Sequence, residues 1–233
     1  MSIDLRPAAS RFHTKIDWLD SWHSFSFADH RDPTNTHHGL LLVSNDDIVD
    51  AGHGFGMHHH RDMEIVTWVI SGQVEHRDSQ GNHAIIYPGL AQRMSAGTGI
   101  MHSEMNPSAT EPVRLVQMWV QPDRRGVTPS YQDADITDAL GKGELVKVAS
   151  GEVDTTPIFI QQKGAELWAG RLPAGTNVAV PRARHVHVFV ATGAVELAGA
   201  SMTEGDAARL TDEGAHTLTV GDDGADVLIW ATT

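Results

Sequence analysis

The most informative feature of this chain is the segment Gly52-His-Gly-Phe-Gly-Met-His-His-His-Arg-Asp-Met-Glu64, together with the later segment His102-Ser-Glu104. Alternate residues of a β-strand point to the same side of the sheet. His58 and His60 can therefore aim two imidazoles at one point, and the later segment can add a third imidazole and a carboxylate. If two such strands face each other, these groups suit a first-row divalent metal such as iron, manganese, cobalt, nickel, copper or zinc.

The spacing of these residues matches two segments of the cupin signature. Residues Gly52 to Glu64 fit glycine-x5-His-x-His-x3-Glu, and His102 to Asn106 fit His-x3-Asn. A lone His-x-His pair would be weak evidence in a chain with 15 histidines. The glycine-rich lead lets the chain turn sharply onto the ligand strand. The combined pattern predicts a metal site in the first half, with three histidines and either Glu64 or Glu104 as ligands.

The composition excludes several other classes of protein. The chain has 233 residues, enough for one large or two small domains, and no cysteine, so it has no disulfide framework, thiolate zinc site or cysteine nucleophile. Its net charge of −13 argues against nucleic acid or an anionic membrane as a direct partner. We see no apolar signal segment and no apolar run long enough to cross a bilayer, so we expect a cytoplasmic protein.

Short apolar runs bounded by Gly, Pro, Asn and Asp recur along the chain, whereas helical periodicity is nearly absent. This spacing is typical of an all-β sandwich or barrel. We expect strands at residues 40–43, 65–70, 84–87, 115–120, 145–148, 186–190 and 227–230. Turn signals occur at residues 45–47, 79–82 and 221–224. A short helix is expected at residues 132–140.

A short internal repeat indicates two copies of one β-barrel. Val69-Ile-Ser-Gly-Gln-Val-Glu75 matches Val190-Ala-Thr-Gly-Ala-Val-Glu196 at an offset of 121 residues, and each copy predicts a strand, a glycine-containing turn and a strand. We therefore expect an N-terminal metal-binding barrel at residues 1–122, a linker at 123–143 and a C-terminal barrel at 144–233.

The repeat also argues against a metal in the C-terminal barrel. At the same offset, the His-x-His pair of the first half corresponds to Ala179 and Pro181, which cannot bind a metal. The pair His185-Val-His187 begins instead at the position that corresponds to Glu64. We therefore expect one metal per chain.

Other histidines and aromatic residues have simpler explanations than ligand binding. His59 lies between two candidate ligands and should point to the opposite face of the strand. His53 and His76 are expected outside the ligand set. The early aromatic residues fit a core better than a ligand platform: Trp18, Trp22, Phe25 and Phe27. The sequence has no Gly-x-Ser-x-Gly nucleophile elbow and no P-loop.

Longer stretches of the first half resemble the pirins, a family with two cupin barrels. The resemblance rests on Trp18-Leu-Asp-Ser-Trp-His-Ser-Phe-Ser-Phe27, Phe55-Gly-Met-His-His-His-Arg-Asp-Met-Glu64, Val74-Glu-His-Arg-Asp78 and Met94-Ser-Ala-Gly-Thr-Gly-Ile-Met-His-Ser-Glu104. The second half resembles the family mainly in its architecture. The resemblance implies that Glu64 lies outside the ligand set and that the metal ligands are His58, His60, His102 and Glu104. Pirins often have proline between the first two ligands, where this chain has His59.

The resemblance also implies a metal-dependent dioxygenase like quercetin 2,3-dioxygenase, which opens the central ring of a flavonol with O2 and releases carbon monoxide. It favours iron(II) as the metal, although the ligand set equally fits manganese, cobalt, nickel, copper or zinc. Glu104 would take the proton from the flavonol hydroxyl, because a carboxylate on the metal lies within reach of that proton. The expected partners are a small aromatic or enolic substrate such as a flavonol and O2, with no nucleic acid and no membrane.

Two other functions stay open at this point. Eukaryotic pirins are known as iron-binding nuclear co-regulators, so the alternative is a metal-binding regulatory or interaction protein without physiological flavonol turnover. Isomerase chemistry on a sugar-like substrate uses the same cupin ligands and is excluded only by the family resemblance. Turnover of quercetin with metal restored would distinguish the dioxygenase from the regulator.

Overall fold

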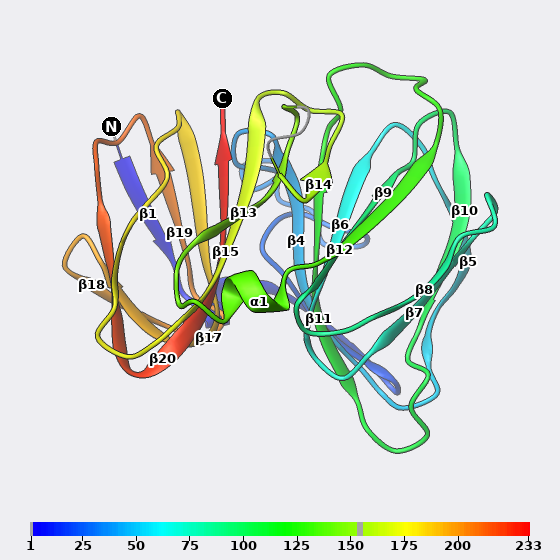
Figure 1. Ribbon diagram of the computed structural model, residues 1–233, viewed down its shortest axis with the longest axis horizontal. Helices are drawn as coiled ribbons and strands as arrows, with labels where there is room; N and C mark the ends of the chain where they lie inside the picture. The colour runs from blue at the N-terminus through cyan, green and yellow to red at the C-terminus, as the bar shows by residue number, and fades with distance from the viewer. Residues whose placement is uncertain (1, 153–155) are drawn as a thin grey trace.

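The computed structural model describes residues 2–152 and 156–233, and nearly all of its regular structure is β-strand (Figure 1). A seven-stranded sheet contains, in spatial order, β12 (Ser130–Asp135), β9 (Leu90–Ser95), β6 (Glu64–Ser71), β11 (Val113–Val120), β4 (Leu41–Val49), β3 (Leu19–His23) and β2 (Phe12–Ile16). A four-stranded sheet contains β5 (Gly54–His60), β10 (Ile100–Met105), β7 (Val74–Asp78) and β8 (His83–Ile86). Together these two sheets form the N-terminal lobe.

A nine-stranded sheet forms the C-terminal lobe. Its main path is β1 (Ser2–Arg6), β19 (Ala207–Thr211), β17 (His185–Leu197), β20 (Thr217–Thr232), β15 (Ala165–Leu172), β13 (Val146–Ser150) and β14 (Ile158–Phe159). Two further strands join it at the side, β16 (Asn177–Ala179) on β20 and β18 (Ala200–Thr203) on β17. The described helices are short: a 3-10 turn at Ala8–Ser10 and α1 at Thr137–Leu140. None of the described helices has the length and apolar character to span a membrane.

The two lobes lie side by side, with the N-terminal lobe on the right in Figure 1 and the C-terminal lobe on the left. The fold confirms the prediction of an all-β chain with two cupin barrels. The seven-stranded sheet lies in the middle of the molecule, because its outer face shares a core with the C-terminal lobe. Its inner face lines a cavity within the N-terminal lobe.

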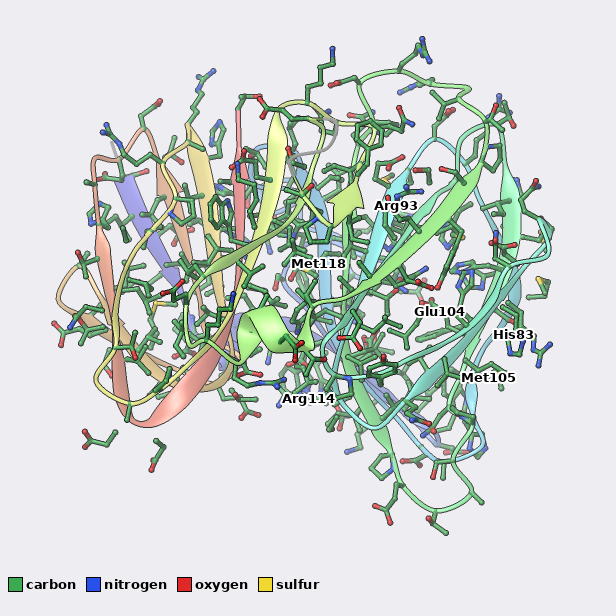
Figure 2. All side chains as sticks on the ribbon, in the orientation of Figure 1. His83, Arg93, Glu104, Met105, Arg114 and Met118 are labelled. Carbon is green, nitrogen blue, oxygen red and sulfur yellow. The ribbon has the colours of Figure 1, made fainter. Side chains whose placement is uncertain are left out.

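Alternation along β11 shows how one sheet serves both surfaces. Val116 and Met118 belong to a core cluster that also contains Leu228 and Trp230 of the C-terminal lobe. The indole Nε1 of Trp230 donates a hydrogen bond to Met118 Sδ at 3.1 Å, and Figure 2 places Met118 between the lobes. Gln117, the residue between them, lines the cavity on the other face. The period of two in a strand therefore separates the lobe interface from the cavity.

The interior of the C-terminal barrel is filled with aliphatic side chains. On β17, Val186, Val188 and Val190 belong to a buried cluster with Leu218. His187 points the other way, towards Phe25 of the N-terminal lobe, with ring centroids 5.7 Å apart. Burial of this apolar surface stabilises the barrel without a metal.

All the strands expected from apolar runs are present, but two predicted turns and the predicted helix differ from the structure. Residues 79–82 form the expected turn between β7 and β8. Residues 45–47 instead lie within β4, paired with β3 and β11, and residues 221–224 lie within β20 at an irregularity in its pairing with β17. Helix forms only over Thr137–Leu140, because residues 130–135 pair with β9.

The predicted segment boundaries remain a prediction, and two strands lie across them. β1 pairs with β19, so the first strand of the chain joins the C-terminal sheet. β12 belongs to the predicted linker, yet it pairs with β9 in the seven-stranded sheet. Both lobes therefore depend on segments from outside their predicted ranges.

The internal repeat has a structural counterpart at its central glycine. Gly72 and Gly193 adopt positive φ angles of 77° and 76°, which L side chains rarely tolerate. A Cβ at Gly72 would lie 2.9 Å from Val113 Cα, and one at Gly193 would lie 3.0 Å from Ala225 Cα. In the first copy the glycine separates β6 from β7, whereas in the second copy it lies in a bulge within β17.

Candidate metal centre

Three histidines converge on the inner face of the small sheet. β5 and β10 are antiparallel neighbours, and His102 pairs directly with His58. One ring nitrogen from each of His58, His60 and His102 lies within 4.8 Å of the other two. The predicted strands therefore do bring the imidazoles together, although they lie beside each other in one sheet and do not face each other across the sandwich.

The hydrogen bonds of these rings leave nitrogens available for a metal. His58 Nδ1 lies 2.8 Å from the carbonyl oxygen of Gly56, so Nδ1 must carry the proton and Nε2 presents its lone pair. His60 Nε2 is buried without a hydrogen-bond partner, as are both ring nitrogens of His102. Buried polar atoms normally have partners. Unpaired nitrogens in a converging cluster therefore fit a bound divalent metal.

Burial also keeps two of these rings in the form that binds metals. Burial lowers the pKa of His60 to about 4, with His102 and His58 adding to the effect. It lowers the pKa of His102 to about 3. Both rings are consequently neutral near pH 7, and a neutral imidazole is the metal-binding form.

Glu104 lies beside the histidine cluster and reaches from the small sheet to the large one. Its side chain is buried, and Figure 2 shows it inside the N-terminal lobe. Thr67 Oγ1 donates to Glu104 Oε1 at 3.1 Å, and Gln117 Nε2 donates to Oε2 at 2.6 Å. The indole Nε1 of Trp119 donates to Gln117 Oε1 at 3.0 Å, which orients the amide. The negative charge of Glu104 opposes the lowering of the pKa of His60, so the two groups interact.

A second layer of polar side chains lies behind His102. The His76 ring is tilted against the His102 ring at a centroid distance of 5.3 Å. His76 Nε2 lies 3.3 Å from Asp78 Oδ2 in a fully buried pair. Asp78 in turn accepts hydrogen bonds from the Asn82 side chain and from two backbone amides. His76 therefore supports the cluster from outside it, as expected.

The other candidate residues point elsewhere. His59 is exposed on the opposite face of β5, as predicted. His53 is exposed and stacks on Trp18 at a centroid distance of 6.3 Å. Glu64 is fully buried, but its Oε2 accepts hydrogen bonds from Ser95 Oγ at 2.7 Å and from the amide of Gln161 at 3.1 Å. Glu64 therefore belongs to the lobe interface, and Glu104 is the carboxylate near the histidines.

The described residues of the C-terminal barrel contain no comparable cluster. Ala179 ends β16, and Pro181 follows it. The rings of His185 and His187 contact the N-terminal lobe. The ring centroids of His185 and His38 are 5.2 Å apart, and the two rings meet edge-on. Across residues 2–152 and 156–233, His58, His60 and His102 are the one group of three or more potential ligands close enough for one ion.

A cavity of about 550 Å³ opens beside the candidate metal centre, between the two sheets of the N-terminal lobe. Three of the four predicted ligands contribute to its wall: His58, His60 and Glu104. Aromatic rings supply much of the remaining surface: Trp18, Phe27, Phe55 and Trp119. This volume and lining are typical of a site for a small organic ligand.

Two of the early aromatic residues thus differ from the expectation of a core role. Trp18 and Phe27 line the cavity, whereas Phe25 belongs to the core shared by the lobes. Trp22 is half-buried and stacks on His13 with ring centroids 3.9 Å apart.

Sequence reasoning missed a polar group in the cavity wall, Asn45 and Asp47 of β4. Both side chains are buried, and Ser21 Oγ donates a hydrogen bond to Asp47 Oδ1. Burial raises the pKa of Asp47 to about 7, and the nearby carboxylates of Asp46 and Glu104 add to this. The clustering of Asn and Asp suggested a turn. Their position between Val43 and Ile48 was the signal for a strand.

Comparison with known proteins agrees with this architecture. Two family models match the chain, Pirin over residues 5–120 and Quercetinase C-terminal cupin domain over residues 147–230. A protein of Mycobacterium tuberculosis (strain ATCC 25618 / H37Rv), provisionally named as a quercetin 2,3-dioxygenase, is 53% identical over 231 residues, which cover 98% of this chain and 94% of that protein. Quercetin 2,3-dioxygenase of Escherichia coli (strain K12) is 39% identical over 228 residues, which cover 98% of this chain and 97% of that protein.

A solved structure shows the same overall arrangement. The crystal structure of the bacterial pirin YhhW from Escherichia coli, in complex with nickel(II), matches with a TM-score of 0.91 and 37% sequence identity, covering 99% of each chain. Its fold and both family models span the two lobes described above. This chain belongs to the pirin family.

Proposed function

We propose that this protein is a metal-dependent dioxygenase of the quercetin 2,3-dioxygenase type, with one divalent metal held by His58, His60, His102 and Glu104. The observation that carries the proposal is the convergence of the His58, His60 and His102 rings, with buried unpaired nitrogens on His60 and His102, next to an aromatic cavity whose wall includes Glu104. The nickel(II) complex of YhhW and the names of the relatives support it. We expect iron(II) as the metal, and nickel(II) is the alternative that metal analysis should distinguish from it.

A divalent metal at this site would supply a Lewis acid and an open coordination position for the reaction of an electron-rich substrate with O2. Glu104 would remove the proton of the flavonol 3-hydroxyl. Thr67 and Gln117 hold its carboxylate and limit its rotation. A base must first lie within hydrogen-bonding reach of the proton that it takes. The two donors support this role for Glu104, because they hold its carboxylate in one orientation before substrate binds.

The cavity supplies orientation and exclusion of water. Trp119 lies edge-on against His60, at a centroid distance of 4.9 Å. Phe27 and Trp18 bring further ring surface to the same space. Flat aromatic walls favour a flat ligand by offset or edge-on contacts between rings. In the overall reaction both atoms of O2 enter the ring-opened ester, and the central carbon bearing the hydroxyl leaves as carbon monoxide.

Elemental analysis followed by reconstitution tests this proposal. Freshly purified protein should contain one equivalent of divalent metal, and oxygen uptake with quercetin should return when iron(II), nickel(II) or manganese(II) is restored to stripped protein. Two equivalents of tightly bound metal would contradict the single site. Full metal occupancy without oxygen uptake for any of these ions would contradict the dioxygenase and favour the metal-binding regulator.

A further inference from the structure

A polar row crosses the inner face of the seven-stranded sheet, opposite the small sheet that carries the histidines. Strand pairing places Ser21 of β3 against Asp47 of β4, and His23 of β3 against Asn45 of β4. Asn45 also pairs with Gln117 of β11. All five residues line the cavity. Because paired residues in neighbouring strands point to the same side, the row forms one continuous polar strip.

Two members of this strip have unused hydrogen-bonding capacity. Asn45 is 3% exposed, and its Oδ1 has no partner at good hydrogen-bonding geometry, although its side chain lies close enough to His23 for a weak hydrogen bond between them. Asp47 is also 3% exposed and accepts a hydrogen bond from Ser21 at Oδ1. Among the described residues its Oδ2 makes no hydrogen bond, and unlike Asn45 Oδ1 it is not completely shielded from the cavity. Leaving buried polar groups unpaired costs free energy, so groups of this kind in a cavity wall indicate a ligand.

The interface between the lobes does not explain these residues. Asp46, which lies between them, points to the opposite face of β4 and accepts hydrogen bonds from Arg114 and Arg11. Arg114 also binds Glu204 and the carbonyl oxygen of Ala191 in the C-terminal lobe, and Figure 2 shows Arg114 between the lobes. Asp46 therefore has a structural partner for its charge, whereas Asn45 and Asp47 face the cavity.

We propose that Asn45 and Asp47 are specificity-determining residues that select hydroxylated planar aromatic substrates by binding hydroxyl groups remote from the reacting centre. The assignment rests on the proposed function for the identity of the ligand class. Aromatic walls bind the flat rings, and the polar strip on one wall binds their hydroxyl edge. An O–H of the ligand donates to Asn45 Oδ1 and to the free oxygen of Asp47.

The ionisation of Asp47 agrees with this role. Burial raises its pKa to about 7, so both the carboxylic acid and the carboxylate are accessible near neutral pH. The acid can donate one hydrogen bond as well as accept others, whereas the carboxylate only accepts. Either form can therefore bind a phenolic hydroxyl.

Binding without turnover tests the assignment. Full-length protein loaded with nickel(II) is titrated under argon with quercetin, which has hydroxyls on both outer rings, and with 3-hydroxyflavone, which has none there. Quenching of tryptophan fluorescence gives the dissociation constants, since Trp18 and Trp119 line the cavity. The parent should bind quercetin more tightly. Asp47→Leu and Asn45→Leu should each reduce that preference by about 5- to 10-fold, the usual effect of losing one or two hydrogen bonds.

Asp46→Asn is the matched control, because it changes a buried carboxylate of the same strand that faces away from the cavity. It should lower thermal stability and keep the parent's preference for quercetin. Because two variants of the strip are measured, the test remains valid if one of them does not fold. An unchanged preference in a folded Asp47→Leu or Asn45→Leu protein overturns the assignment. Failure of the parent to bind either flavonol overturns the proposed function instead.

Discussion

At the scale of single residues, the histidine cluster combines burial with unpaired nitrogens. His60 and His102 are neutral near pH 7 because burial lowers their pKa values. His60 Nε2 and both ring nitrogens of His102 are buried without protein partners, so the metal-free state leaves them unsatisfied. A bound metal would remove this cost and should therefore add stability to the fold.

Replacing one ligand should remove the metal and leave the fold. His102→Ala should weaken metal binding by more than the roughly 10- to 100-fold that follows loss of a group that merely orients a ligand. The core clusters of both lobes do not contain these histidines, so unfolding should stay cooperative. Metal analysis and circular dichroism check the result. His59→Ala, on the exposed face, should keep its metal, and an unfolded metal-free His102→Ala protein at room temperature would contradict this prediction.

Glu104→Gln should separate metal binding from catalysis. Glutamine keeps the size and an oxygen donor but loses the negative charge and the basicity. At matched metal content, turnover of quercetin should fall by about 10²- to 10⁴-fold, the usual contribution of a general base. Glu64→Gln is the control, because Glu64 binds Ser95 and Gln161 at the interface and should leave turnover near the parent's. Parent-like turnover by metal-loaded Glu104→Gln would show that Glu104 is not the base.

Asp47 should make the parent less stable as the pH rises. The unfolded chain releases this proton near the ordinary pKa of 3.8, whereas the folded chain holds it until about pH 7. The folded state therefore binds more protons between these values, and stability falls through this range as pH increases. Asp47→Asn removes the effect, so its advantage over the parent should grow from pH 4 to 7 and level off at about 4 kcal/mol. Urea unfolding across pH measures it, and a pH-independent difference would rule it out.

At the scale of elements, alternation within strands decides which residues reach the cavity. β4 directs Asn45 and Asp47 inwards and Asp46 towards the arginines of the interface. The sequence allowed the His-x-His strand to be predicted, because its spacing repeats a known signature and its side chains alternate with a period of two. The same alternation in residues 45–47 was hidden by turn-forming residue types, whose polarity suits an inward cavity wall. The alternation of these residues becomes visible only from the pairing of β4 with strands that are distant in the sequence.

Strand pairing also explains why the helix predicted at residues 132–140 and the core role predicted for two aromatic residues differ from the structure. Residues 132–135 looked helical in isolation, yet they pair with residues 90–93 and complete the edge of the seven-stranded sheet. Trp18 and Phe27 have the spacing of core residues, and nothing in the local sequence shows that the space beside them is hollow. The ligand histidines were predictable from local sequence, whereas the shape of the cavity depends on contacts between strands distant in the chain.

The two repeat glycines give an element-scale prediction. Gly72→Ala and Gly193→Ala should each destabilise the protein by about 2–3 kcal/mol, because a positive φ angle and a clash with a neighbouring strand act together. Gly81→Ala is the control, since Gly81 has a φ of 91° but no atom within 4 Å of the added Cβ. It should cost only about 1 kcal/mol. Equal losses in all three variants by urea unfolding would contradict the close approach.

At the scale of the whole molecule, the two barrels share one framework and differ in their interiors. The C-terminal barrel is filled by aliphatic side chains, whereas the N-terminal barrel holds the cavity. The C-terminal lobe covers the outer face of the seven-stranded sheet and buries it in a common core. Arg93 adds a polar link, donating to the carbonyl oxygen of Phe159 at 2.8 Å. The second barrel thereby supports the wall of the cavity that lies opposite the histidines.

The fate of the oxygen atoms distinguishes flavonol cleavage by a dioxygenase from other chemistry at this site. Metal-loaded protein is supplied with quercetin and oxygen-18 gas, and the ring-opened product and released gas are analysed by mass spectrometry. Flavonol cleavage by a dioxygenase predicts that both labelled atoms enter the product and that unlabelled carbon monoxide appears in equal amount. Fully metal-loaded protein that yields no carbon monoxide, or a product whose new oxygen comes from water, would contradict dioxygenase cleavage of the flavonol.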